Sequence, residues 1–346
     1  MGRIESRAVP TRSSAVAMRT PQSWRLARRL WVVVAILSAA VALAIPARVA
    51  PAERAEPAPA RRSSGCGSPA VAGTTTEMLD VAGTPRQYRL AVPSEATGKR
   101  PLPLILNFHG ARSNEVAQAV VSQLEEKGPA RGFVVITPLS NLGGWSKPGP
   151  KFFEPHDTNL AFPRALIDAA AANLCIDKHR VYATGLSDGA GMSAYLGCKM
   201  SRQLAAIAPV AGVNLAEPCP HGNPMSVIAF HGTADASVAY GGGAVPGRPA
   251  MDVPSVETAA KAWAQRAGCR TKPASQAIGT EVQRITYRGC DRANAVVLYS
   301  VTGGGHTTPG SFDVPRNGHV TQDINAADLM LEFFSHHPPP SKNAKS

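Results

Sequence analysis

The chain has no apolar run long enough for an ordinary transmembrane helix. The longest, Leu30 to Ile45, holds 16 residues, whereas a helix that crosses a bilayer needs about 20. Seven arginines precede it within residues 1–29, and a basic segment before a short hydrophobic one is the layout of a secretory signal. We therefore expect residues 1–50 to be a signal peptide and the protein to be secreted, extracellular or periplasmic. An uncleaved anchor, which would hold the protein at the membrane, is the alternative.

Motifs for metal ions and cofactors are also missing from the sequence. No Cys/His spacing fits a zinc site, and no His-Glu-x-x-His motif occurs. We therefore expect chemistry that uses neither a metal nor another cofactor.

The basic charge of the chain lies mostly before the part expected to fold. The formal net charge is +12, but residues 1–64 hold 11 Lys and Arg and 3 Asp and Glu, a balance of +8, which leaves +4 for the remainder. No block of Lys and Arg and no nucleic-acid recognition motif marks that remainder. Nucleic acid is therefore not an expected partner.

The rest of the chain divides by composition. Residues 51–65 are rich in Pro, Ala and Arg, which predicts a disordered tether. Residues 66–336 alternate strand-like and helix-like segments and are numerous enough to bury one core, so we expect a single α/β domain there. The proline-rich tail, residues 337–346, is expected to be disordered.

All six cysteines lie after the predicted leader. An even number in an exported chain predicts disulfides, although six cysteines allow 15 pairings. Cys269 and Cys290 flank a segment with the pattern of a hairpin, and theirs is the one disulfide that we predict. The pairing of the other four stays open: Cys66, Cys175, Cys198 and Cys219.

The most informative motif is Gly185-Leu186-Ser187-Asp188-Gly189, a G-x-S-x-G sequence. The β-branched and aromatic segment 180–184 before it predicts a strand, and the segment 190–200 after it predicts a helix. A sharp turn from strand to helix is the setting of a nucleophile elbow, which lifts a serine hydroxyl clear of the sheet edge. Ser187 is therefore the predicted nucleophile.

Two further strand ends supply an acid and a base. The apolar run 227–230 leads to Asp235, and the run 295–301 leads through a glycine-rich turn to His306. Active sites of open α/β sheets form at such strand ends. The order Ser187, Asp235, His306 is that of α/β-hydrolases. We therefore expect an α/β-hydrolase fold, with a mostly parallel central sheet and helices on both faces.

The chemistry of an acyl transfer assigns roles to these residues. His306 would take the proton of the serine hydroxyl and return it to the leaving alcohol, and Asp235 would orient the imidazole. The oxyanion hole would use the backbone N–H groups of Asp188 and Ala111, with Arg112 as the alternative to Ala111. His109, in the same loop as Ala111, is expected to be structural.

Three aromatic residues are the candidates for a substrate pocket. Trp145 and Phe152 belong to a long loop, 138–156, that leaves the same sheet edge as the predicted triad, and Tyr240 follows Asp235. Aromatic rings at this edge would line an acyl or aryl pocket. Ordinary packing under surface loops is the alternative for each.

Three segments together resemble a known family: Arg180 to Gly189, His231 to Asp235, and Gly303 to Gly310. They are similar to the secreted polyhydroxybutyrate depolymerase-like esterases, which overlap the feruloyl and acetylxylan esterases of carbohydrate esterase family one. The resemblance spans residues 88–334. It implies a secreted serine carboxylesterase that acts through an acyl-enzyme on feruloyl or acetyl esters of plant polysaccharides. The substrate would be an ester and could be polymeric.

Several alternatives share this fold. The closest is an extracellular polyhydroxyalkanoate (polyhydroxybutyrate) depolymerase. An acyltransferase of the antigen-85 type would keep the triad and pass the acyl group to a sugar. A non-catalytic surface binding protein would have no reason to keep Ser, Asp and His at three strand ends, which argues against it.

Two positions depart from the family pattern. Ala190 stands where the family usually has a second glycine after the elbow, and Thr308 replaces a tryptophan close to the histidine. The triad is intact, so we expect the difference to lie in the substrate wall beside His306.

Overall fold

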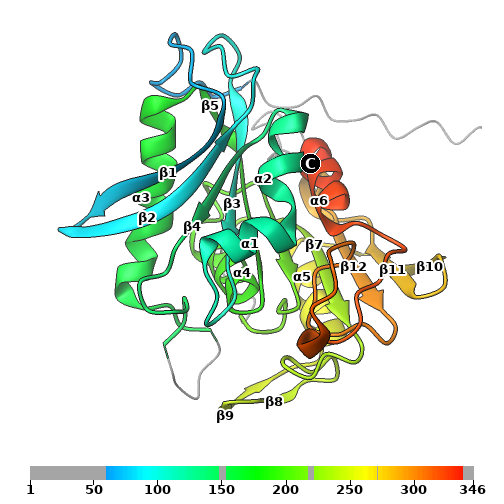
Figure 1. Cartoon of the computed structure of the whole chain (residues 1–346). Helices are drawn as coiled ribbons and strands as arrows, with labels where there is room; N and C mark the ends of the chain where they lie inside the picture. Colours follow the sequence, from blue (N-terminus) through cyan, green and yellow to red (C-terminus); the bar gives the residue numbers. More distant parts are fainter. Residues whose placement is uncertain (1–59, 148–152, 217–221, 271, 338–346) are drawn as a thin grey trace, which may run out of the picture. The chain divides into compact units, whose positions relative to one another are not determined.

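A mixed β-sheet runs through the centre of the structure, a computed structural model that describes residues 60–147, 153–216, 222–270 and 272–337 (Figure 1). Its strands are β1 (Gly73–Val81), β2 (Thr84–Val92), β3 (Leu102–Phe108), β4 (Val134–Pro138), β5 (Ile176–Leu186), β6 (Ala206–Val210), β7 (Ser226–Gly232), β10 (Ala274–Ile278), β11 (Val282–Tyr287) and β12 (Val296–Val301). A separate two-stranded hairpin consists of β8 (Gly243–Val245) and β9 (Arg248–Val253).

The large sheet has the strand order β1-β2-β4-β3-β5-β6-β7-β12-β11-β10. Neighbouring strands are parallel from β4 to β12, and the two strands added at each edge pair antiparallel. The mostly parallel sheet predicted from the sequence is confirmed. The carboxyl ends of β3, β5, β7 and β12 therefore meet at one edge.

Helices cover both faces of this sheet (Figure 1). They are α1 (Glu115–Ser122), α2 (Leu124–Lys127), α3 (Asp157–Asn173), α4 (Asp188–Lys199), α5 (Val256–Arg266) and α6 (Ala326–His336), with 3₁₀ turns η1 (Pro129–Arg131), η2 (Asp291–Ala293) and η3 (Pro315–Asn317). Side chains of α3, α4 and α5 share one buried cluster with one face of the strands. Those of α2 and α6 share a second cluster with the other face.

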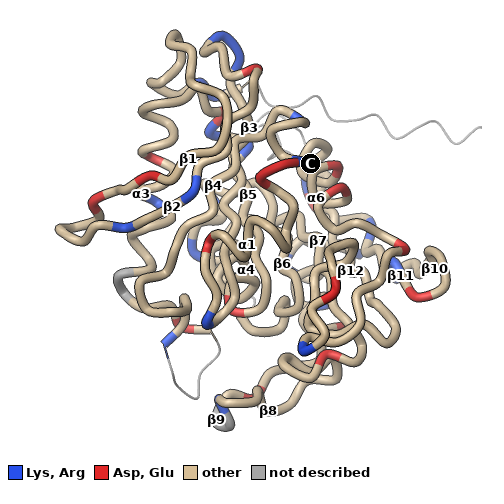
Figure 2. The backbone as a smooth tube through the Cα atoms, in the orientation of Figure 1, with Lys and Arg blue, Asp and Glu red and all other residues tan. Residues whose placement is uncertain are grey.

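The central strands are apolar because both of their faces are covered. Every residue of β3, β6, β7 and β12 is buried, and none of these strands carries a charged residue. Charged residues lie on helices, turns, the outer strands and the start of β5, which holds Asp177, Lys178 and Arg180 (Figure 2). The edge strand β10 is mostly exposed.

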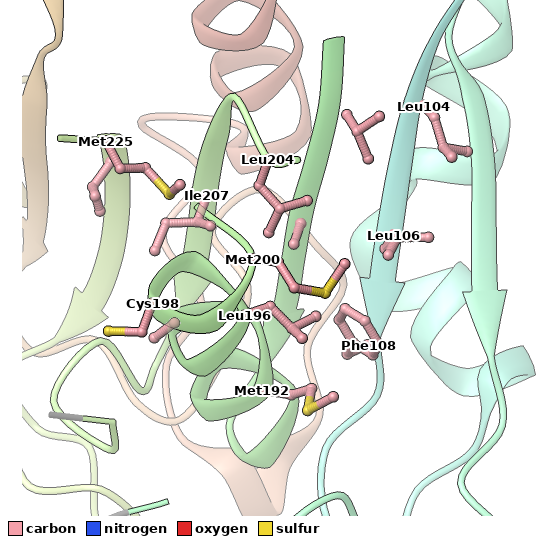
Figure 3. Close-up of a cluster of buried hydrophobic side chains, with 14 of the residues drawn as sticks. Leu104, Leu106, Phe108, Met192, Leu196, Cys198, Met200, Leu204, Ile207 and Met225 are labelled. Atoms are coloured by element: carbon pink, nitrogen blue, oxygen red, sulfur yellow. The ribbon is translucent and has the colours of Figure 1, made fainter. Parts of the chain in front are cut away.

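Helix α4, which follows the predicted nucleophile, is fixed by its apolar side chains. Met192 and Leu196, together with Met200 directly after the helix, point toward β3, where Phe108 lies (Figure 3). All four side chains are at most 5% exposed, and burying one Leu or Met typically contributes about 2 kcal/mol. Close packing also needs Gly197, because a Cβ there would lie 3.0 Å from Ile207 Cδ1. The helix that positions the elbow is thus part of the core.

The domain begins earlier than the sequence predicted. Residues 51–65 were predicted to be a tether, but the segment from Arg61 onward is bound to the fold. The Ser63 hydroxyl donates to Leu174 O at 2.7 Å and accepts from Ile176 N–H at 2.9 Å. Gly65 N–H donates to Ala171 O at 2.9 Å. These hydrogen bonds to residues far along the chain, which composition does not reveal, fix the last five residues of the predicted tether.

The domain also extends one residue beyond its predicted end. His337, the first residue of the predicted tail, stacks on Phe333 with ring centroids 4.0 Å apart, and its Nδ1 lies 2.7 Å from Phe333 O. This residue is therefore packed against α6. Residues 338–346 lie outside the described residues.

Two disulfides join described residues. The predicted pair Cys269–Cys290 is bonded and closes the segment that holds the hairpin β10–β11. Cys66 is bonded to Cys175, a pairing that the sequence left open. Disulfides of this kind are typical of proteins that fold in oxidising compartments. Within the described ranges, no helix is long and apolar enough to cross a membrane; the predicted leader lies outside these ranges.

Candidate active site

Ser187 lies at a sharp turn between β5 and α4. Its backbone adopts φ 59° and ψ −119°, a strained region for a residue with a side chain, which costs on the order of 1–3 kcal/mol. Two hydrogen bonds hold it there: Ser187 N–H donates to Val210 O at 2.9 Å, and Ser187 O accepts from Gly191 N–H at 3.0 Å. The turn has the conformation of a nucleophile elbow.

The second glycine of the motif has a steric role. A Cβ at Gly189 would lie 2.1 Å from Phe108 O and 2.7 Å from His109 O. Any side chain there would push α4 away from the end of β3. Glycine therefore lets the elbow lie directly against the loop that follows β3.

Asp235 and His306 are joined by a hydrogen bond. His306 Nδ1 lies 2.8 Å from Asp235 Oδ2, and their side chains are 13% and 0% exposed. The other carboxylate oxygen, Oδ1, accepts from the backbone N–H groups of Ser237 and Val238, both at 2.8 Å. The carboxylate is thus fixed from two sides and binds the imidazole through one nitrogen.

A second histidine contacts the same carboxylate. Buried His231 has its Nε2 2.8 Å from Val238 O and 3.4 Å from Asp235 Oδ2. Burial raises the pKa of Asp235, but hydrogen bonds from His231 and His306 outweigh burial and bring that pKa well below its ordinary value. Asp235 is therefore ionised at neutral pH, as stabilisation of an imidazolium requires.

Ser187 and His306 line one cavity of about 890 Å³. Among the described residues, none forms a hydrogen bond with Ser187 Oγ. The hydrogen bonds of an active site are often long or poorly aligned before substrate binds. The hydroxyl is thus open to the cavity that also contains the imidazole.

The loop after β3 places a backbone donor beside the elbow. A Cβ at Gly110 would lie 3.4 Å from Ser187 Cβ, so this loop lies against the predicted nucleophile. Arg112 N–H already donates to Gly143 O at 2.6 Å. The N–H groups of Ala111 and Asp188 have no acceptor within the described part of the chain. This distinction favours Ala111 over Arg112 as the second donor of an oxyanion hole.

Comparison with known proteins agrees with this geometry. Residues 86–264, slightly more than half of the chain, match the family described as Esterase PHB depolymerase.

The chain belongs to this family.

It is therefore a carboxylic ester hydrolase. Feruloyl esterase B of Piromyces equi is 30% identical over 234 residues, which are 64% of this chain and 42% of that protein. The chain thus spans less than half the length of that relative. A putative esterase, NocK, of Nocardia uniformis subsp. tsuyamanensis is 30% identical over 289 residues, 76% of this chain and 83% of that protein.

A solved structure has the same fold. Acetyl xylan esterase from Aspergillus awamori aligns with 76% of this chain and 99% of its own, with a TM-score of 0.52 and 15% sequence identity. At that identity the likeness concerns the fold alone.

The aromatic residues predicted to line the pocket of this esterase do not do so where the structure describes them. Trp145 is fully buried, and its Nε1–H donates to His109 O at 2.8 Å. Tyr240 lies beside His231 and its hydroxyl is 3.2 Å from Glu257 Oε1. Neither residue lines the cavity. Phe152 lies outside the described residues.

The loop that holds Trp145 is nevertheless tied to the elbow. The carboxylate of Asp188 is buried and accepts from Trp145 N–H at 2.5 Å and from the Ser146 hydroxyl at 2.5 Å. It also lies 3.4 Å from Arg248 Nη2 on β9. The sequence predicted only a backbone role for Asp188. An acidic residue directly after the nucleophile is the one sequence feature that could have indicated this connection.

His109 has the structural role that was expected. Its Nε2 accepts from Ser140 N–H at 3.0 Å, and its Nδ1 lies 2.7 Å from Gly110 O. Burial lowers the pKa of His109. A neutral ring with its proton on Nδ1 satisfies both hydrogen bonds, so this residue braces the loop after β3.

Part of the wall of the cavity comes from the loop 138–156, which the sequence singled out, and the rest comes from segments that it did not. Its apolar part is aliphatic, and the basic residues Arg112, Arg248 and Arg316 lie among the same lining residues. The hairpin β8–β9 supplies Val245, Arg248 and Met251. Thr308, which was predicted to alter the substrate wall, is buried and is not a lining residue. The described lining therefore contains no Phe, Tyr or Trp.

Proposed function

We propose that this protein is an exported serine esterase whose Ser187 forms an acyl-enzyme. The observation that carries the proposal is the pairing of Asp235 with His306 at 2.8 Å in the cavity that Ser187 also lines. A neutral serine hydroxyl is a weak nucleophile and needs such a base. With Nδ1 bound to Asp235, His306 has Nε2 left for the serine proton.

The reaction has two halves, formation of the acyl-enzyme and its hydrolysis. Ser187 Oγ attacks the ester carbonyl while His306 takes its proton, and the N–H groups of Ala111 and Asp188 stabilise the negative charge on the carbonyl oxygen. The intermediate collapses as His306 returns the proton to the departing alcohol. Water, activated by the same imidazole, then attacks the acyl-enzyme and releases the acid and free Ser187.

For the substrate, we propose feruloyl or acetyl esters of plant polysaccharides. Relatives named feruloyl esterases and a fold neighbour named acetyl xylan esterase support this class. Within the class, the aliphatic lining favours the smaller acetyl group, because no ring of Phe, Tyr or Trp lines the described cavity to stack on a ferulate. An extracellular polyhydroxyalkanoate depolymerase is the second candidate, and the family description together with the aliphatic lining supports it.

We also propose that the protein is exported. Disulfides Cys66–Cys175 and Cys269–Cys290 suit an oxidising compartment. Mass spectrometry of the mature N-terminus from the extracellular or periplasmic fraction tests this part. A new N-terminus near residue 50 would support a cleaved signal, and an intact residue 1 in the membrane fraction would contradict it.

Hydrolysis of 4-nitrophenyl acetate beside methyl ferulate tests the function, with Ser187→Ala as the comparison. We expect the variant to lose kcat/KM by on the order of 10⁴-fold and to stop reacting with a fluorophosphonate probe. Ser193→Ala is a matched control, because Ser193 is a buried serine of α4 that bonds only its own helix, at Ala190 O. Undiminished activity of Ser187→Ala would overturn the proposal.

A further inference from the structure

Three arginines line the same cavity as Ser187 and His306. They come from separate segments: Arg112 from the loop after β3, Arg248 from β9, and Arg316 from η3. Asp188 is the one carboxylate among the described lining residues, so the lining has a formal charge of +2.

That single carboxylate does not neutralise the cavity. Asp188 is committed to Trp145 N–H and the Ser146 hydroxyl, and its only guanidinium partner is Arg248, at 3.4 Å. Among the described residues, no carboxylate lies within ion-pair distance of Arg112 or Arg316. Outside the cavity, by contrast, Arg89 and Arg180 pair with carboxylates at 2.8 Å. Within the described part of the chain, Arg112 and Arg316 thus line the cavity without a carboxylate partner.

The backbone fixes both unpaired arginines next to the reacting groups. Arg112 follows Ala111 directly, and its left-handed backbone, with φ 57°, is held by the hydrogen bond from its N–H to Gly143 O. Arg316 precedes Asn317, whose carbonyl accepts from His306 N–H at 2.7 Å. One arginine therefore neighbours the proposed oxyanion donor, and the other is tied to the proposed base.

We propose that the esterase selects esters that carry a carboxylate beside the scissile bond, bound by Arg112 and Arg316 with help from Arg248. This inference rests on the proposed function of Ser187 and names the chemistry of its substrate. A guanidinium binds a carboxylate through paired, charge-assisted hydrogen bonds. A cavity lined by one sign of charge also concentrates ligands of the opposite sign. The carboxylate belongs either to the acyl part or to the alcohol part of the ester.

Two pairs of esters test the proposal and separate these sources. For the acyl part, mono-4-nitrophenyl glutarate is compared with 4-nitrophenyl pentanoate, which has the same chain length without the charge. For the alcohol part, 4-acetoxybenzoate is compared with its methyl ester. The quantity measured in each pair is the ratio of kcat/KM for the charged ester to that for the neutral one. Dividing the two values cancels effects that a substitution has on the reacting groups themselves.

We expect Arg316→Gln to lower this ratio about tenfold in one of the two pairs, and Arg112→Gln with Arg316→Gln to lower it further. The pair that responds identifies the part of the ester that carries the charge. Arg202→Gln is the matched control, because Arg202 is exposed in the turn after α4 and does not line the cavity. Added NaCl should lower the ratio of the wild-type protein, since salt screens exposed charge.

An unchanged ratio in both pairs for the double variant would overturn this proposal while leaving the serine esterase in place. If wild-type protein and Ser187→Ala hydrolysed the neutral esters equally, the proposed function itself would fail. The two failures are therefore distinguishable in one set of measurements.

Discussion

The ends of the central strands and the wall of the cavity are built in different ways. Ser187, Asp235 and His306 follow β5, β7 and β12, three neighbouring or near-neighbouring strands whose hydrogen-bonded register brings their ends together. The wall comes from a small hairpin and from loops, which a few side-chain contacts hold in place. Residues at strand ends are positioned by the sheet, whereas residues of the wall depend on each loop separately. Asp188 is the link between the two regions, because its backbone belongs to the elbow and its carboxylate to the wall.

The largest effect on activity is expected from replacing Asp235, the acid at the strand ends. Asp235→Asn should lower kcat by about 10³- to 10⁴-fold, because an amide cannot stabilise the imidazolium and permits the wrong tautomer. Steady-state kinetics with 4-nitrophenyl acetate measures the change. Asp168→Asn, at an exposed position of α3, is the control. A loss below tenfold for Asp235→Asn would mean that the strand ends do not form a working triad.

A large effect on stability is expected from adding a side-chain atom between the elbow and β3. Gly189→Ala should reduce the free energy of unfolding by about 3 kcal/mol, since its Cβ would overlap Phe108 O. Thermal unfolding followed by circular dichroism measures it. At Gly241 a Cβ would meet nothing within 4 Å and the backbone is not left-handed, so Gly241→Ala is the matched control. Equal melting temperatures of the two variants would contradict the steric argument.

Asp188→Asn should weaken the contacts between the strand ends and the cavity wall while leaving the elbow backbone intact. The change removes a buried charge that binds Trp145 N–H, Ser146 and Arg248, and we expect a loss of about 1–3 kcal/mol in stability. Because the wall loosens, KM should rise more than kcat falls. Denaturant unfolding and steady-state kinetics measure both. A fall in kcat with unchanged KM would show that this carboxylate serves the reaction rather than the wall.

The pH dependence of stability gives a further test of the strand ends. The folded pKa of Asp235 is depressed, so the unfolded state binds its proton more readily and the carboxylate stabilises the fold. That contribution is fully present above the unfolded pKa of about 4 and is lost as the pH falls toward the folded pKa. Urea unfolding at pH 6 and pH 3 measures it. Asp235→Asn should lose less stability over this interval than the wild type; an equal loss would contradict the shifted pKa.

The smallest effect is expected from a residue between the two regions. Trp145→Phe keeps the packing against Phe108 and removes the hydrogen bond from Nε1–H to His109 O. We expect a loss of about 1 kcal/mol in stability and little change in KM, because the ring is buried. A large rise in KM for methyl ferulate alone would restore Trp145 as a substrate contact.

The difference between the strand ends and the cavity wall also explains which features could be predicted from the sequence. The apolar runs 103–108, 227–230 and 295–301 give strands because strands buried on both faces have few polar positions. The last two lead to Asp235 and His306, and Ser187 follows β5 in the same way. Trp145 was predicted at the correct sheet edge, but the side to which a loop residue points depends on contacts such as the one with His109 O. The basic wall was missed for a similar reason. Arg112, Arg248 and Arg316 are isolated in the sequence, and only the folded chain brings them to one cavity.

The disulfide Cys66–Cys175 has a mechanical consequence. Cys175 directly precedes β5 and Ser187 directly follows it, so the two lie at opposite ends of this 11-residue strand. Force applied through the chain before residue 66 would reach the sheet covalently at this disulfide, at the end of β5 opposite Ser187. Protein immobilised on a support through that end would therefore be attached at the end of β5 opposite Ser187.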